Sequence, residues 1–172
     1  MRKLINVIAF QIGWFAAVLG AAHGMPWLGV VVVLLTLALH LALSPYWRPE
    51  FFLAVAAAIM GFLFDTALVS AGVFSPVFYL LPSPFSPLWM VMLWVNFATT
   101  LNVSLGGLRG KYTLEAILGA TGGPIAYYSG AKLGAMTAIP AATELMILGL
   151  AWAAAVPALF LIAVHINRQF KV

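Results

Sequence analysis

The sequence predicts an all-α polytopic membrane protein with six transmembrane helices in one bundle. Two observations predict this class. Of the 172 residues, 65% are hydrophobic and only 7% are charged, so a soluble domain of this length would lack the polar groups to cover its surface. The apolar residues also fall into six segments, each close to the ~20 residues that a helix needs to cross a bilayer.

Each predicted span is bounded by turn-forming residues or by charge. The boundaries fall at Gly24 and Pro26, at Ser44 and Pro45, at residues 82–87, at residues 109–111 and at Pro140. The spans are predicted over residues 4–22, 27–43, 51–74, 88–108, 114–135 and 145–164. Residues 1–172 are therefore expected to form a single transmembrane domain.

The basic residues predict the orientation, because cytoplasmic ends of spans carry an excess of Lys and Arg. With the N-terminus inside, only Lys132 lies near the outer face. The other seven fall on the cytoplasmic side: Arg2, Lys3, Arg48, Arg109, Lys111, Arg168 and Lys171. Both termini are expected in the cytoplasm. The net charge of +4 is spread over short clusters rather than one stripe, so no nucleic-acid partner is expected.

One alternative concerns the first segment, which follows Arg2 and Lys3 and ends in small residues, as a signal peptide does. Asn6 and Gln11 interrupt its apolar run. Its removal would also weaken the charge asymmetry. The segment is therefore predicted to be a retained transmembrane helix.

Asp65 is the most informative residue, since residues 51–74 contain no other ionisable side chain. A charge at membrane depth is costly, which makes an intramembrane acid a functional-site hypothesis. Ala57, Gly61 and Asp65 are four residues apart, so the acid shares a face with small residues, where membrane helices approach closely. Asp65 is expected to point into the bundle. The alternative is a buried acid that only holds helices together.

Depth predicts which residues gather near Asp65. At ~1.5 Å per residue, Asp65 lies roughly 21 Å along its span, in the outer half of the bilayer. Lys132 and Glu144 flank the outer ends of the fifth and sixth spans, and Asn96 lies near the middle of the fourth. One hydroxyl of Tyr127 or Tyr128 is expected to join them. The predicted ligand-binding residues are Asp65, Asn96, Asn102, Tyr128 and Lys132.

Structural alternatives exist for these positions. Lys132 is also placed to extend toward the headgroups, and Glu144 to complement the N-terminus of the sixth helix. Asn96, Thr99 and Thr100 share one helical face, which is consistent with polar contacts between helices as well as with ligand binding. The uncharged segment 75–87 is predicted to lie in the outer interface, as a lid or as a membrane-hugging connection.

The sequence contains no motif that names a reaction. There is no Cys, which excludes disulfides and thiolate metal sites. His40 and His165 both lie near cytoplasmic ends of spans, where interfacial placement accounts for them. Neither HExxH, GxSxG, a P-loop nor a dinucleotide fingerprint is present. No metal site and no cofactor is expected.

Four segments resemble a family of small bacterial inner-membrane proteins, domain of unknown function 2878. They are LINVIAFQIGWFAAVLGA, GFLFDTALVSAGVF, PLWMVMLWVNFATTLNVSL and GGPIAYYSGAKLGA. The resemblance covers nearly the whole chain and implies a multi-pass protein of the bacterial inner membrane. No activity is established for the family, whose genes often accompany genes for fatty-acid modification. This implies a role near membrane lipids and assigns no catalytic residue.

Three functions remain open from the sequence. The leading hypothesis is a protein that binds or transports a lipid or amphipathic small molecule in a polar cavity in the outer half of the membrane. The second is a membrane-embedded lipid-modifying enzyme with Asp65 as general acid or base. The third is a structural subunit of a membrane complex. The expected partners are membrane lipids, an amphipathic ligand, and a second copy or another membrane protein.

Overall fold

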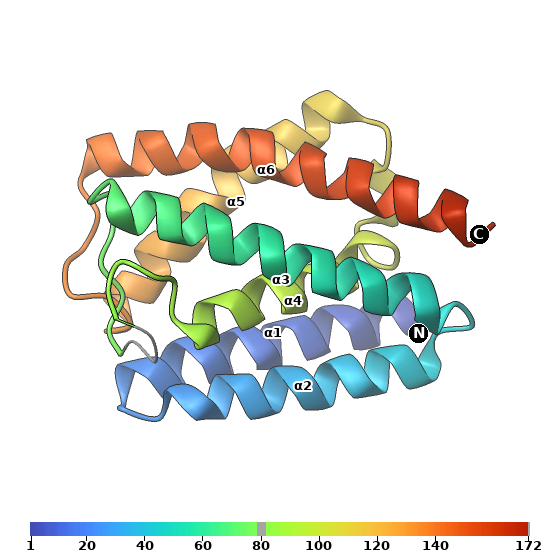
Figure 1. Cartoon of the computed structure of the whole chain (residues 1–172), viewed down its shortest axis with the longest axis horizontal. Coiled ribbons are helices and arrows are strands. Elements are labelled where there is room, and N and C mark those ends of the chain that lie inside the picture. The colour runs from blue at the N-terminus through green and yellow to red at the C-terminus, as the bar shows by residue number, and fades with distance from the viewer. Residues whose placement is uncertain (79–81, 172) are drawn as a thin grey trace.

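The computed structural model describes residues 1–78 and 82–171, and nearly all of the regular structure in them is helical (Figure 1). The six α-helices are α1 (Arg2–Ala22), α2 (Pro26–Leu43), α3 (Trp47–Ser70), α4 (Leu88–Leu101), α5 (Tyr112–Lys132) and α6 (Ala142–Gln169), and the short 3-10 helix η1 (Gly106–Leu108) precedes α5. The predicted all-α class is confirmed, and one α-helix overlaps each predicted span.

Four helices differ from the predicted ranges by three residues or more: α3 spans 47–70 rather than 51–74, α5 spans 112–132 rather than 114–135, and α4 and α6 differ for identifiable local reasons. The helix expected over 88–108 ends at Leu101, where the Thr100 carbonyl accepts the N–H groups of Val103 and Leu105 and turns the chain. By contrast, α6 begins at Ala142, because the Glu144 carboxyl group accepts the backbone N–H of Ala141 and caps the helix. This is the capping role that the sequence offered as an alternative for Glu144.

The helices run back and forth along one axis, so that both termini lie at the same end (Figure 1). The α2–α3 and α4–α5 connections lie at this end too, which we call the basic end. It carries seven of the eight Lys and Arg residues: Arg2, Lys3, Arg48, Arg109, Lys111, Arg168 and Lys171. Lys132 closes α5 at the opposite end. The basic residues that the sequence analysis assigned to one side therefore lie at one end of the bundle.

Helix α4 lies in the centre of the bundle and packs on α1, α2, α3 and α6. Eleven of its fourteen residues are buried. Its length corresponds to about 21 Å, less than the ~30 Å of a bilayer core. The irregular backbone that follows it at Asn102 and Ser104 is half-buried.

Glycines set the closest helix contacts. A Cβ at Gly29 of α2 would lie 2.4 Å from the Ala17 Cα of α1, and one at Gly119 of α5 would lie 2.0 Å from the Trp152 carbonyl oxygen of α6. Only a glycine fits such contacts, which are typical of membrane helix pairs. The close packing of α5 on α6 therefore requires a glycine at position 119.

Four of the helices, α1, α2, α3 and α6, are long and apolar enough to cross a membrane. Helix α5 has 21 residues, but its glycines and hydroxyl-bearing side chains lower its hydropathy, and α4 is short. Helix α2 buries only Gly29 and Val33 and exposes large apolar side chains such as Leu34 and Leu35. Several helices therefore have the length and the apolar surface that are typical of membrane proteins.

At the end opposite the termini, the α3–α4 and α5–α6 connections are joined. Val77 N–H donates to the Ala135 carbonyl at 3.0 Å, and Thr137 N–H donates to the Ser75 carbonyl at 2.9 Å. The Trp89 indole of α4 donates to the Val77 carbonyl at 3.2 Å. The predicted lid segment 75–87 is thus fastened to its neighbours at its start, while residues 79–81 lie outside the described residues.

Candidate functional site

Asp65 lies inside the bundle, where its side chain has no solvent exposure. Trp94 of α4 donates its indole N–H to Asp65 Oδ2 at 2.9 Å. The Tyr127 hydroxyl of α5 donates to Asp65 Oδ1. Among the described residues, no Lys, Arg or His forms an ion pair with this carboxyl group. One acid thereby connects three helices through two uncharged donors.

An aromatic cluster encloses Asp65. Trp94 and Trp152 stack with ring centroids 4.5 Å apart, and Phe64 meets both rings edge-on, at 4.9 and 5.6 Å. Two glycines make room for them: a Cβ at Gly61 would lie 2.1 Å from the Trp94 ring, and one at Gly123 would lie 2.3 Å from the Trp152 ring. The small face predicted on α3 therefore accommodates the donor to Asp65.

A cavity of about 680 Å³ lies between α1, α4 and α5, beside this cluster. We call it the α1–α5 cavity. It forms because α5 packs chiefly on α6 and has few contacts with α1 and α4. Its lining combines apolar and aromatic side chains with a few polar ones: Val7, Phe10, Gln11, Trp14, Phe15, Val18, Asp65, Trp89, Met90, Leu93, Trp94, Phe97, Thr100, Ser104, Leu105, Leu118, Gly122, Gly123, Ile125, Ala126, Tyr127, Ser129, Gly130, Met136, Trp152 and Val156.

The cavity opens sideways between α1 and α5. Val7 and Phe15 on α1 are 43% and 48% exposed, and Ile125 on α5 is 64% exposed, although all three belong to the lining. Toward the end opposite the termini, Ala17 and Ala21 of α1 and Tyr127 and Ala131 of α5 belong to one buried cluster. The exposed lining residues therefore place an opening of the cavity on the side of the bundle, between α1 and α5.

Asn96 is buried beside this site but does not belong to the cavity lining. Its amide donates to the Phe10 carbonyl of α1 at 2.8 Å, and it occupies the space left by Gly13. Asn102 lies at the basic end, where its Oδ1 accepts from Asn167 at 3.0 Å and from Arg109. Both amides join helices, the alternative role that the sequence offered for polar residues of this span.

Tyr128 and Lys132 lie on the outward face of α5. Both are exposed, and the Lys132 ammonium group lies 5.6 Å from the centre of the Tyr128 ring, a cation–π arrangement. Of the five predicted residues, the structure therefore brings Asp65 to the cavity, buries Asn96 behind it, and places Asn102, Tyr128 and Lys132 elsewhere.

The residues that sequence reasoning missed are mainly aromatic. Trp94, Tyr127 and Trp152 surround Asp65, but only Tyr127 had been weighed, as the alternative to Tyr128. A usable signal was present: Gly61 precedes Asp65 by one turn, and Gly123 precedes Tyr127 by one turn. A glycine one turn from a polar residue marks the place where a large side chain from another helix fits.

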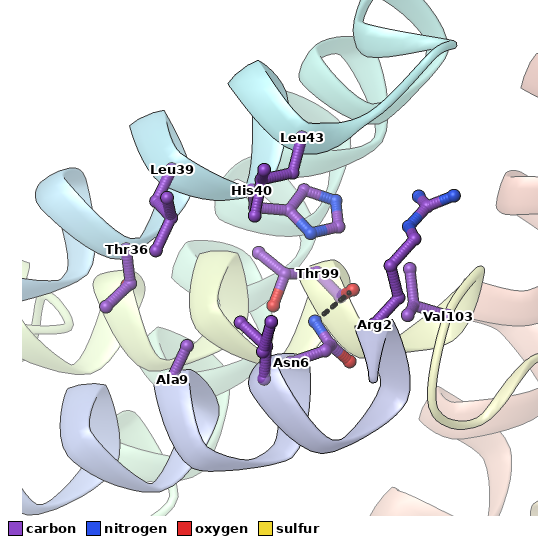
Figure 2. Close-up of a pocket in the computed structure, with 10 residues that line it drawn as sticks. Arg2, Asn6, Ala9, Thr36, Leu39, His40, Leu43, Thr99 and Val103 are labelled. Carbon is purple, nitrogen blue, oxygen red and sulfur yellow. Dashed lines mark hydrogen bonds between the residues drawn. The ribbon is translucent and has the colours of Figure 1, made fainter.

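A second, small pocket of about 30 Å³ lies at the basic end between α1, α2 and α4. In Figure 2 the His40 ring lies between α2 and the Asn6–Thr99 hydrogen bond, which measures 3.0 Å. His40 Nε2 is 3.3 Å from the Glu50 carboxyl group of α3. A pocket of this volume has room for about one water molecule. In the described part of the chain, no group of three His, Asp or Glu residues is arranged to hold a metal ion.

Comparison with known proteins gives one match. A family model described as protein of unknown function (DUF2878) matches residues 3–158, which include the Asp65 cluster and the whole lining of the α1–α5 cavity. No curated protein and no solved structure matches the chain at a significant level.

Proposed function

The chain belongs to this family of proteins of unknown function, and from its own geometry we propose that it binds a lipid or another amphipathic molecule in the α1–α5 cavity. The observation that carries the proposal is the cavity of about 680 Å³ beside Asp65. Binding pockets for small molecules typically measure ~300–1,000 Å³ and pair an apolar lining with a few polar groups. This cavity has both properties.

The shape of the cavity suits a molecule that arrives from the bilayer. Its lining follows α1 from Val7 to Val18, a distance of ~17 Å at 1.5 Å per residue. That is close to the ~15 Å of one leaflet of the hydrocarbon core. An apolar chain can enter between α1 and α5 without crossing water, while the Asp65 cluster forms part of the wall.

The placement of Asp65 favours binding over catalysis. Both of its oxygens accept hydrogen bonds, and its side chain is completely covered. A general acid or base must reach the proton that it transfers. Tyr127, to which Asp65 is hydrogen-bonded, also lines the cavity, so we propose that Asp65 acts on an occupant by orienting the Tyr127 hydroxyl.

We further propose that all six helices lie in the membrane, with both termini on the cytoplasmic side of a bacterial inner membrane. The asymmetry of Lys and Arg between the two ends supports this orientation. The short α4 is compatible with it, since other helices surround α4.

The orientation can be tested with single cysteines, because the natural chain contains none. We expect Ile139→Cys, in the α5–α6 connection, to react with a membrane-impermeant maleimide in intact bacterial spheroplasts. We expect Gln169→Cys, at the end of α6, to react only after permeabilisation. Both positions are exposed. The reverse labelling pattern would contradict the orientation.

Occupancy of the cavity can be measured by tryptophan fluorescence. Four of the six Trp residues line it: Trp14, Trp89, Trp94 and Trp152. We expect a bromine-bearing long-chain alcohol, added at low mole fraction to nanodiscs that contain the protein, to quench this fluorescence saturably. A molecule that merely dissolves in the bilayer gives quenching that rises without saturation.

Two phenylalanine substitutions provide the comparison. A Cβ at Gly122, which lines the cavity, meets no atom within 4 Å, and neither does one at Gly107 in η1, outside the lining. We expect Gly122→Phe to fill the cavity and abolish the saturable component, and Gly107→Phe to retain it. Equal quenching in the wild type and in Gly122→Phe would refute binding in this cavity.

A further inference from the structure

Three hydroxyl groups on the cavity wall, those of Tyr127, Thr100 and Ser104, already donate their protons to the protein. The Tyr127 hydroxyl donates to Asp65. The Thr100 hydroxyl donates to the Phe97 carbonyl at 2.6 Å, and the Ser104 hydroxyl donates to Asn6 Oδ1 at 2.6 Å. A hydroxyl has one proton and two lone pairs. These three oxygens can therefore only accept a hydrogen bond from an occupant.

The lining also lacks positive charge. Within the described residues, no Lys, Arg or His belongs to it, and its one ionisable acid is Asp65. An anionic headgroup placed here would lose its hydration and gain no cation, only uncharged donors such as the Trp152 indole N–H, which is buried without a partner. A cationic group would not reach the Asp65 carboxyl group either, because this side chain is fully covered and each of its oxygens already accepts from Trp94 or Tyr127.

We infer that the cavity takes an uncharged amphiphile whose polar group donates a hydrogen bond, such as a long-chain alcohol or a monoacylglycerol, and discriminates against anionic lipids. This inference rests on the proposed function and adds the chemical class of the occupant. Its key residue is Tyr127, because Asp65 keeps the Tyr127 proton turned away from the cavity and leaves the phenol oxygen as an acceptor.

Three probes with the same brominated chain test the inference by the quenching measurement described above: the alcohol, its methyl ether, and the corresponding fatty acid at a pH where it is ionised. The ether has the shape of the alcohol without a donor, and the acid adds a negative charge. We expect the alcohol to bind about tenfold more tightly than the ether, since one buried hydrogen bond contributes roughly this factor. The ionised acid is expected to bind most weakly.

The outcomes separate the two proposals. If no probe quenches saturably, the proposed function fails. If all three bind equally, or if the ether or the acid binds best, the cavity is a lipid site and the inference about its chemistry is overturned. A brominated alkylamine that binds more tightly than the alcohol would likewise overturn it, in favour of a cation site at Asp65.

Two substitutions locate the acceptor. Tyr127→Phe removes the phenol oxygen and is expected to reduce the preference for alcohol over ether to about one, while ether binding remains. Thr100→Val, which removes a second acceptor without exposing Asp65, is expected to reduce the preference partly and guards against misfolding of the first variant. Thr121→Val, on the exposed face of α5, is the control and is expected to retain the full preference. An unchanged preference in both Tyr127→Phe and Thr100→Val would refute the assignment.

Discussion

Replacing Gly119 by Ala is expected to destabilise the protein strongly. The new Cβ would lie 2.0 Å from the carbonyl oxygen of Trp152 and 2.6 Å from its carbonyl carbon. These are backbone atoms of α6 and cannot turn aside as a flexible side chain can. Helices α5 and α6 must separate, and overpacking of this kind costs about 1–3 kcal/mol, or more where backbone has to move. The melting temperature in detergent and the free energy of unfolding in a denaturing detergent titration measure the effect.

The same substitution one turn away on the same helix supplies the control. A Cβ at Gly122 meets no atom within 4 Å, so Gly122→Ala is expected to leave stability unchanged or to raise it by about 0.5–1 kcal/mol, because Ala restricts the unfolded chain. Since both variants make the same chemical change in α5, helix propensity cancels between them. Equal melting temperatures for the two would show that α5 and α6 do not pack as described.

The fold could be predicted from the sequence because its signals are local. Apolar segments separated by Gly, Pro and charge specify where helices form, and one α-helix overlaps each predicted span. The end of α4 could not be predicted in this way. It depends on the Thr100 carbonyl closing a turn with Leu105, in a stretch whose composition still looks like a transmembrane helix.

The site was predictable only in part, because depth does not determine contact. Asp65 could be recognised as a charge among apolar residues, and its inward direction followed from the small residues on its face. Tyr127 and Tyr128 lie at nearly equal depth, yet they point in different directions from α5: one is buried against Asp65 and the other is exposed. Only the rotation of α5 about its axis decides between them, and Gly123 and Trp152 set that rotation.

Asp65→Asn is expected to reverse the chemistry of the cavity wall without unfolding the protein. The Trp94 indole can only donate, so it keeps the amide oxygen as its acceptor. The amide nitrogen must then face Tyr127, whose hydroxyl turns to accept. The Tyr127 proton is released toward the cavity, which gains a donor where it had an acceptor. We expect the tenfold preference for alcohol over ether, worth about 1.4 kcal/mol, to fall to about one, with ether binding strengthened.

A comparison of variants separates this reversal from simple destabilisation. Trp94→Phe leaves Asp65 Oδ2 without its donor and is expected to lower stability by ~1–3 kcal/mol. It leaves the Tyr127 hydroxyl bonded to Asp65, so the preference for the alcohol should persist.

Tyr127→Phe is expected to lower the free energy of unfolding less in the Asp65→Asn background than in the wild type, since a buried amide left unpaired is penalised less than a carboxylate. If Asp65→Asn keeps the preference for the alcohol while Trp94→Phe loses it, Asp65 does not orient Tyr127, and the site works through the tryptophan instead.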